Sequence, residues 1–536
     1  MTPKTHPAIY ETLWTEQEKW AWDRISRGKV ADFNAGDAYG GLISPADEFL
    51  WSEKRVLTAG FIEAVLLGED AEKFLTHHGV MIRGACFKEP LNFPNAVLGW
   101  QLGLIGCRFD GDVQMDFLKT PYSIYFNGSR FKGKLNMEGA DVGKNLLMTS
   151  CEFEGAVELP GLHVGAGMAV SGSKFRGQTT FGGIKTGGDL FIRNAAEFDV
   201  EVFLNNVSAA SIDICGAKFK RHLKISGVEV LGAFVIRDGS EFDRGLDAAG
   251  LKASRIEITG SKFAAGAVFQ NVEAAEYVTA SGCSFTELAF KFSKVRTRLS
   301  FSHCEAALLD LTGTLIDGEL QIASKEHPSM KWAEGARAVL RNTHAKTLRD
   351  MPNAWPPEVD LSGFTYVDLG EAHSIAGRDF KWIKGWLGKQ LSFSPQPYTE
   401  LGTALLRAGQ KEKAEKIFYE GLRMQRKRSG GFSWLSMLVQ EFSVGYGYRL
   451  GLLAWWALLF TAVGVLLMQR FGAYLIENIA DNAAFSLGMM FPMLRIEDPE
   501  AIKNLGLLKY YFYSLKIVGY FLISMLIAGV SGILKK

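Results

Sequence analysis

Apolar residues in the middle of the chain occur in pairs two positions apart, and the phase of these pairs shifts at regular intervals. After Phe131, for example, Leu135 pairs with Met137, and Ala140 pairs with Val142. A period of two indicates β-strands, because successive side chains of a strand point to opposite faces, whereas a helix repeats its apolar residues three and four positions apart. The pattern therefore predicts short strands that are joined by tight corners.

The phase shifts belong to an internal repeat. Small-residue segments that end in phenylalanine recur ten times at steps of 21 to 23 residues. The ten phenylalanines are Phe87, Phe109, Phe131, Phe153, Phe175, Phe198, Phe219, Phe242, Phe263 and Phe285. Two residues before each of them stands Ala, Ser or Cys, which leaves room for the ring. We therefore predict a mainly β fold, a right-handed parallel β-helix in which each repeat forms one coil and neighbouring coils lie about 4.8 Å apart.

The cysteines are expected to fill the core of this β-helix. Cys107, Cys151 and Cys283 occupy the small position before the phenylalanine, and Cys304 stands where an eleventh repeat would place it. The six cysteines of the chain contain no CxxC pair and no zinc-type spacing. We therefore expect free thiols in a reducing compartment, and no metal site. A redox relay, the functional alternative, would need an adjacent pair of cysteines.

The segments on either side of the repeats have different patterns. The N-terminal segment has mixed helical patterning and is expected to cap the first coil, whose strand edge would otherwise be unpaired. After about residue 310 the phenylalanine register fades, and three prolines at 352–357 exclude a central strand or helix there. Two helices separated by Gly409 follow. They are similar to one tetratricopeptide-type hairpin, which we interpret as a bracket between rod and membrane rather than as a peptide-binding groove.

Two apolar segments near the C-terminus are long enough to cross a bilayer. The first, residues 450–468, contains nineteen uncharged positions, or about 28 Å of helix, and the second is residues 510–534. An amphipathic segment at 432–442 is expected to lie at the membrane interface. Between the two spans, residues 483–494 are uncharged but too few to cross, which is typical of a re-entrant or interfacial segment.

The sequence thus divides into five parts. They are a helical N-terminal cap at 1–78, the β-helix at 79–325, a connector at 326–394, the helical hairpin at 395–431 and a membrane domain at 432–536.

Basic residues gather before the first span, where we expect them to lie at the membrane surface. They are Arg423, Arg426, Lys427, Arg428 and Arg449. The positive-inside rule therefore predicts that both the N-terminal domain and the C-terminus are cytoplasmic. The start of the chain agrees with this orientation, because it lacks the basic and apolar stretches of a signal peptide.

The segment from Ser443 to Gly447, SVGYG, differs by one residue from the TVGYG loop that forms potassium filters. It precedes the first span instead of lying between the two, and Arg449 follows it closely. We therefore reject a filter, and expect the two glycines to let the chain turn from the interfacial helix into the membrane. A pore would instead be built around the short segment between the spans.

Six residues are candidates for lining such a pore or for lying at membrane depth. They are Phe485, Ser486, Gly488, Pro492, Arg495 and Lys516. An ionisable residue inside a membrane indicates function. For Lys516 the alternative, which we favour, is that its long side chain extends to the membrane surface.

Composition excludes several classes of function. The 59 Lys and Arg residues balance 58 Asp and Glu residues, so we expect no nucleic acid among the partners. The sequence contains neither HExxH nor GxSxG, and GAGMAV at 165–170 ends in valine where a dinucleotide-binding turn has Gly or Ala. We therefore predict that the protein is not an enzyme and has no cofactor.

Several segments resemble known proteins. The small residue two positions before each phenylalanine is similar to that of pentapeptide-repeat proteins, although the coil here is slightly longer. From residue 57 to 536 the chain resembles a group of bacterial pentapeptide-repeat-like membrane proteins, some of which are named "membrane-associated oxidoreductase". The matching segments are LTAGFIEAVLLGED, GVMIRGACF, WPPEVDLSGFTY, PQPYTELGTALLRAG and GYGYR. The resemblance implies a β-helix protein of the bacterial inner membrane, and it implies no biochemical role.

These observations leave two main hypotheses for the function. In the first, the β-helix is a cytoplasmic sensing or assembly rod whose membrane segments form homo-oligomers around a pore in the lipid bilayer, as in a stress or phage-defence effector. In the second, a non-conducting anchor tethers a scaffold that binds an unidentified protein partner. An oxidoreductase, suggested only by the name of the similar proteins, is a third. The segment between the spans favours the pore, because a plain anchor does not need it.

Overall fold

The structure, a computed structural model, describes residues 13–47, 49–370, 375–471, 478–491 and 506–531. The chain forms two compact units. The first comprises Met1–Arg378 with Lys389–Leu391, and the second comprises Asp379–Gly388 with Ser392–Lys536.

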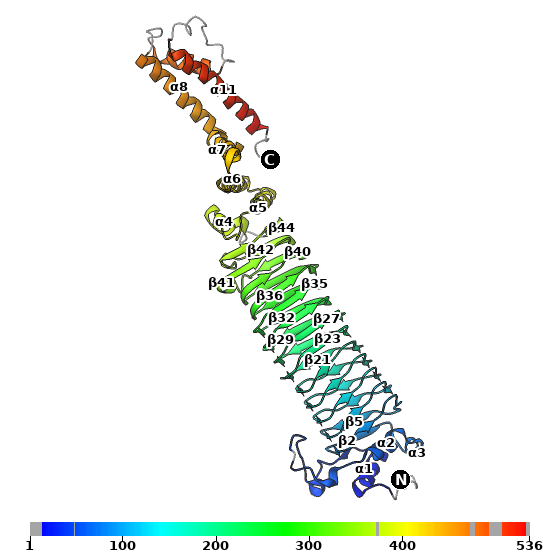
Figure 1. Cartoon of the computed structure of the whole chain (residues 1–536). Coiled ribbons are helices and arrows are strands. Elements are labelled where there is room, and N and C mark those ends of the chain that lie inside the picture. Colours follow the sequence, from blue (N-terminus) through cyan, green and yellow to red (C-terminus); the bar gives the residue numbers. More distant parts are fainter. Residues whose placement is uncertain (1–12, 48, 371–374, 472–477, 492–505, 532–536) are drawn as a thin grey trace. The chain divides into compact units, whose positions relative to one another are not determined.

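The first unit is a parallel β-helix of about 13 turns, which confirms the predicted fold class (Figure 1). Its described strands form two sheets of 22 strands each. A typical coil gives two short strands to each sheet. In one such coil, β8 (Lys119–Thr120) and β9 (Ile124–Tyr125) belong to one sheet, and β10 (Arg130–Phe131) and β11 (Leu135–Asn136) belong to the other.

The ten predicted phenylalanines stack into one ladder inside the β-helix. Consecutive rings from Phe87 to Phe285 are nearly parallel, with centroids 4.4 to 5.2 Å apart. This spacing is close to the separation of hydrogen-bonded strands, about 4.8 Å, so each coil contributes one ring. The cysteines predicted to fill the core, Cys107, Cys151, Cys283 and Cys304, are all buried and free.

The corners of the coils form ladders of their own, in which the backbone has positive φ. One ladder comprises Asn95, Phe117, Gly139, Gly161, Gly183, Asn206, Gly227, Gly250, Asn271, Phe292, Gly313, Asn342 and Gly363. Glycine and asparagine predominate because they adopt this left-handed conformation at the lowest cost. Where Phe117 stands at such a corner, its ring lies over the next coil, and a Cβ atom on Gly139 would be 2.5 Å from it.

The β-helix extends beyond residue 325, where the sequence predicts its end. Four further strands continue the two sheets, namely β41 (Lys331–Val339), β42 (His344–Asp350), β43 (Glu358–Asp360) and β44 (Thr365–Asp368). The three prolines that had suggested a connector lie between β42 and β43, so they interrupt no strand.

Two features hide these last coils in the sequence. Ala306 lies beside Phe285 on the next coil and replaces the expected phenylalanine. The corner residues Gly313 and Asn342 are 29 residues apart instead of 21 to 23, because this coil contains an insertion. Backbone pairing between coils needs neither the phenylalanine nor a constant coil length, so the strands continue without the sequence signal.

The N-terminal segment covers the first coil. It contains α1 (Glu16–Ser26), β1 (Ala31–Asp32), α2 (Ala59–Leu67) and α3 (Glu69–Glu72). β1 pairs in parallel with β2 (Val80–Arg83) and so occupies the strand edge that would otherwise be open.

Arg55 holds this cap together from inside. The side chain is fully buried. Its guanidinium donates hydrogen bonds to the Tyr39 carbonyl at 2.8 Å, the Asn34 side chain at 2.7 Å and the Gly84 carbonyl at 3.1 Å, and also to the Gly41 carbonyl. Burial lowers the pKa of Arg55, and these four acceptors replace the water that the charge has lost. The arginine thereby joins the N-terminal loop to the first coil.

A second buried arginine lies near the last coils. Arg378 donates to both carboxylate oxygens of Asp350, at 2.8 and 2.9 Å, and Trp355 donates its indole N–H to the same carboxylate. Burial raises the pKa of Asp350, while Arg378 acts in the opposite direction. The pair fixes the segment after β44 to the end of β42.

The second unit is helical. Its described helices are α4 (Phe380–Leu387), α5 (Gln396–Arg407), α6 (Lys411–Arg428), α7 (Gly431–Val444), α8 (Gly451–Phe471), α9 (Ile479–Met490) and α11 (Leu508–Val530). α5 and α6 form the predicted hairpin, and Gly409 between them has a φ of 74°. Gly421 of α6 lies against Tyr398 of α5, where an added Cβ atom would be only 2.8 Å from the Tyr398 side chain.

We predict that Arg55→Met loosens the N-terminal cap, because it leaves several buried acceptors without a donor. A loss of about 3 kcal/mol would make the amides of β1 and β2 exchange with deuterium about 100-fold faster. Arg83→Met is the matched control, since Arg83 is half-exposed and its ion pair with Asp32, at 3.3 Å, is a surface contact. Equal protection of β2 in both variants would show that Arg55 does not hold the cap.

Candidate functional site

Two helices of the second unit are long and apolar enough to cross a membrane. α8 has 21 residues with a mean hydropathy of 2.1 in its most apolar window, and α11 has 23 residues with a value of 1.7. They correspond to the predicted spans at 450–468 and 510–534. Their outer faces expose large side chains such as Trp455, Leu466, Ile517 and Val530. A β-helix with two such helices is compatible with a membrane-anchored β-helix protein.

The short segment predicted between the spans is a helix that packs against both of them. Phe485, Met489 and Met490 of α9 belong to one apolar core with residues of α8 and α11. The contacts involve small residues: a Cβ atom on Gly464 of α8 would be 2.6 Å from the Ser486 hydroxyl, and one on Gly519 of α11 would overlap the Met490 carbonyl. The backbones of the three helices therefore approach each other closely.

The bounds of α9 differ from the predicted 483–494. The helix begins at Ile479, because the Asn478 side chain accepts the Ala480 N–H at 3.1 Å and so caps its first turn. Asp481 lies in this first turn, so the helix begins before the uncharged segment that the sequence predicts. Residues 492–494, the predicted end, lie outside the described residues.

The residues predicted to line a pore lie in three different settings. Phe485, Ser486 and Gly488 are buried, and the Phe485 ring contacts Phe512 edge-on at 5.3 Å. Lys516 is partly buried on α11. Pro492 and Arg495 lie outside the described residues. Within one chain, the three residues of α9 therefore take part in helix packing.

The segment resembling a potassium filter forms a turn, as predicted. Gly445, Tyr446 and Gly447 have φ values of 55°, 56° and 84°, and the chain changes direction there between α7 and α8. The Tyr446 ring is buried, and its hydroxyl donates to Glu441 at 3.2 Å. Burial and the nearby carboxylate both raise the pKa of Tyr446. This tyrosine therefore anchors the turn.

The five basic residues predicted at the membrane surface have different surroundings. Arg426 donates to Glu441 at 2.6 Å, and Arg423 lies 3.6 Å from the same carboxylate. Arg428 lies over the Phe393 ring, and Lys427 is exposed. Glu441 was not among the predicted residues. Its signal in the sequence is that it is the one charged residue in an otherwise uncharged helix, α7, which indicates a basic partner.

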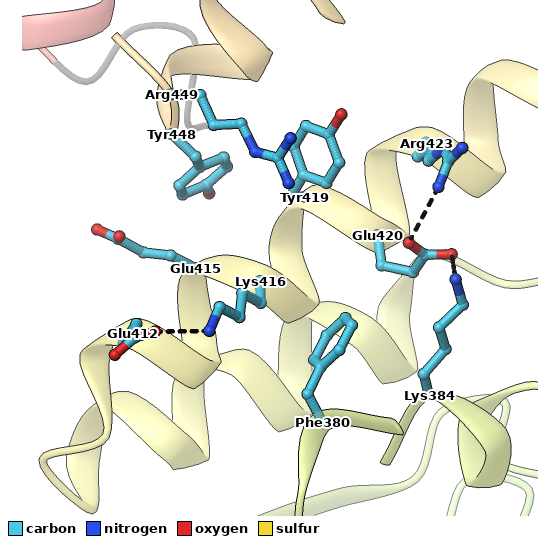
Figure 2. A pocket seen from close by; sticks show the side chains of 10 residues that line it. All are labelled: Phe380, Lys384, Glu412, Glu415, Lys416, Tyr419, Glu420, Arg423, Tyr448 and Arg449. Atoms are coloured by element: carbon cyan, nitrogen blue, oxygen red, sulfur yellow. Dashed lines mark hydrogen bonds and ion pairs between the residues drawn. The ribbon is translucent and has the colours of Figure 1, made fainter. Parts of the chain in front are cut away.

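Arg449, the fifth of these residues, lies over the face of the Tyr419 ring, 4.4 Å from its centroid. It borders two cavities. The first, of about 500 Å³, is lined by α4, α6 and the segment before α8 (Figure 2). The second, of about 440 Å³, shares Tyr419 and Arg449 with the first and continues along α8. The two cavities thus meet at this pair.

Most charges in the first cavity are paired. Lys384 contacts Glu420 at 2.9 Å, and Lys416 contacts Glu412 at 2.5 Å (Figure 2). Glu415 also lines the cavity, near Tyr448 (Figure 2). Burial, together with the charge of Glu415, raises the pKa of Tyr448 to about 12.

The β-helix contains one pair of stacked cysteines. Cys283 and Cys304 directly precede Ser284 and Glu305, which pair between adjacent coils, so the two thiols are neighbours and interact electrostatically. This interaction lowers the pKa of Cys283 and raises that of Cys304. The sequence analysis found no adjacent pair because 21 residues, one full coil, separate the two. In the described part of the chain, no group of three or more His, Cys, Asp or Glu residues could hold a metal ion.

We predict that Gly519→Leu lowers the stability of the helical core of α8, α9 and α11, because the new side chain would overlap the Met490 carbonyl. The expected loss is about 2 to 3 kcal/mol, measured as helix loss during titration with a denaturing detergent. Gly451→Leu is the control, since a Cβ atom on Gly451 meets no atom within 4 Å. Equal stability of the two variants would contradict the close packing of α9 on α11.

Comparison of the chain with protein-family models, with curated proteins and with solved structures finds no match in any of the three.

Proposed function

We propose that the protein is a membrane-anchored scaffold, in which α8, α9 and α11 form a non-conducting anchor and the β-helix binds protein partners in the cytoplasm. One observation carries the choice of scaffold over pore. The short helix α9, whose sequence favoured a pore, is buried against both spans and contributes Phe485, Met489 and Met490 to their common core. In an anchor that conducts no ions, α9 therefore still has a structural role, because it completes the core between α8 and α11.

The small residues of the spans support the same conclusion. Membrane helices associate through small residues, because these allow close approach of the backbones. Gly464 and Gly519 are covered by α9, and Gly529 lies against Leu450, where a Cβ atom would be 2.5 Å from its side chain. With these positions occupied within one chain, the outer faces of the spans present large apolar side chains that suit lipid.

The surface of the β-helix supports binding of proteins. Charges of both signs form ion pairs between coils: Asp213 pairs with Arg193 and Arg237, and Lys220 contacts Glu197 at 2.5 Å. Such a mixed surface does not favour nucleic acid. A groove of about 670 Å³ also lies on the β-helix, and Leu231 on its wall is 87% exposed. Exposed apolar side chains within a polar surface are typical of protein interfaces.

A pore formed by several copies of the chain is the second candidate. The Ser486 hydroxyl is buried without a hydrogen-bond partner among the described residues, and so is the Thr461 hydroxyl. Unpaired hydroxyls inside an apolar core are costly. A rearrangement that separated the helices and let water reach these groups would remove that cost.

We predict that liposomes containing the full-length protein show no ion flux above that of lipid alone, and that Ser486→Ala does not change this result. The anchor should remain folded in this variant, because the lost hydroxyl has no described partner. Ion flux is measured with a potential-sensitive dye, and a pore-forming peptide serves as positive control. Flux from the wild-type protein that Ser486→Ala alters would contradict the scaffold and support the pore.

A further inference from the structure

Arg449 is a cation without a carboxylate partner at the start of a candidate membrane span. The residue is exposed and its guanidinium lies over the Tyr419 ring, but it forms no ion pair with any described residue. The nearby Glu441 is already engaged by Arg426 and by the Tyr446 hydroxyl. The planar guanidinium of Arg449 is therefore available for an external anion, and two parallel N–H donors suit a phosphate group well.

Glu415 is an anion in the same cavity and also has no ion-pair partner among the described residues. It is partly buried, whereas Glu412 and Glu420 of the same helix are paired with lysines. Figure 2 shows Glu415 and Arg449 on the two sides of Tyr448. One unpartnered cation and one unpartnered carboxylate in a single cavity are complementary to a group that carries both charges.

An apolar strip leads away from Arg449 along α8. Leu452, Trp455 and Leu459 are spaced three and four residues apart, so they lie on one face of the helix. These residues line the second cavity together with Trp456, whose indole N–H donates to the Phe442 carbonyl at 2.7 Å. This hydrogen bond joins α8 to α7 beside the strip, and the apolar side chains of the strip suit a hydrocarbon chain.

The geometry points to a binding site for a phospholipid with a phosphoethanolamine headgroup. The phosphate binds Arg449, the primary ammonium binds Glu415, and an acyl chain lies on the strip of Leu452, Trp455 and Leu459. This assignment rests on the proposed membrane anchoring. It explains why Arg449 and Glu415 remain unpaired in a cavity whose other charges are neutralised within the chain.

The site distinguishes this headgroup from others by its chemistry. A primary ammonium donates hydrogen bonds to a carboxylate, whereas the quaternary ammonium of phosphatidylcholine has no hydrogen to donate. Phosphatidylglycerol provides the phosphate for Arg449 but no cation for Glu415, which is left facing an anionic ligand. We therefore expect phosphatidylethanolamine to bind most tightly of the three.

The test is native mass spectrometry of the full-length protein in detergent, titrated with the three lipids carrying identical acyl chains. We expect phosphatidylethanolamine to bind about tenfold more tightly than phosphatidylcholine. Glu415→Gln should lower its affinity about tenfold without weakening phosphatidylglycerol, whereas Arg449→Gln should weaken both lipids. Lys427→Gln is the matched control, because Lys427 is exposed and lines neither cavity. The melting temperature of each variant shows whether it is folded.

Two results would overturn the proposal. One is equal affinity for the three lipids in the wild-type protein, and the other is an unchanged affinity for phosphatidylethanolamine in both Glu415→Gln and Arg449→Gln. Soluble glycerophosphoethanolamine should bind at least 100-fold more weakly than the lipid, and equal binding would show that α8 holds no acyl chain. Flotation of the protein with liposomes tests the membrane anchor separately. Selective lipid binding by a protein that does not float would therefore disprove the anchor and leave the lipid site standing.

Discussion

The first unit depends on hydrogen bonding between identical positions of successive coils. Because each coil pairs with the next at a separation of about 4.8 Å, every coil must repeat the backbone path of its neighbour. A ring at one inward position is then followed by another ring directly above it, and a left-handed corner by another left-handed corner. The phenylalanine ladder from Phe87 to Phe285 and the glycine and asparagine ladders are two results of this single constraint.

Because of the same constraint, the two ends of the β-helix need hydrogen-bond partners from outside the coils. An interior coil finds its hydrogen-bond partners above and below, whereas a terminal coil lacks them on one side. At the N-terminus β1 supplies a strand, and Arg55 binds the carbonyls of the loop that follows it. Near the last coils, Asp350 and Arg378 form a buried pair. The buried guanidinium of Arg55 satisfies several carbonyls of irregular backbone, whereas that of Arg378 is paired with the Asp350 carboxylate.

The interior of the β-helix could be predicted from the sequence because its signal is repeated. Ten phenylalanines at a constant step reveal the coil length and the inward position at once. The last coils could not be predicted in this way, since Ala306 replaces the ring and an insertion precedes Asn342. The pairing of Arg426 with Glu441, and the contact of Arg449 with Tyr419, were also hidden, because these contacts join separate segments of the chain and leave no periodic pattern.

The membrane helices follow a related rule, in which small residues decide where backbones meet. Gly464 and Gly519 allow α9 to approach α8 and α11, and this contact buries Ser486. In the proposed anchor, the packing of α9 against α8 and α11 accounts for the short helix between the two candidate spans. Since this core is completed within the chain and the outer faces are apolar, the proposed lipid recognition is concentrated at the segment before α8. There Arg449 and Glu415 keep their charges unpaired, whereas the other charged residues of the first cavity form ion pairs within the chain.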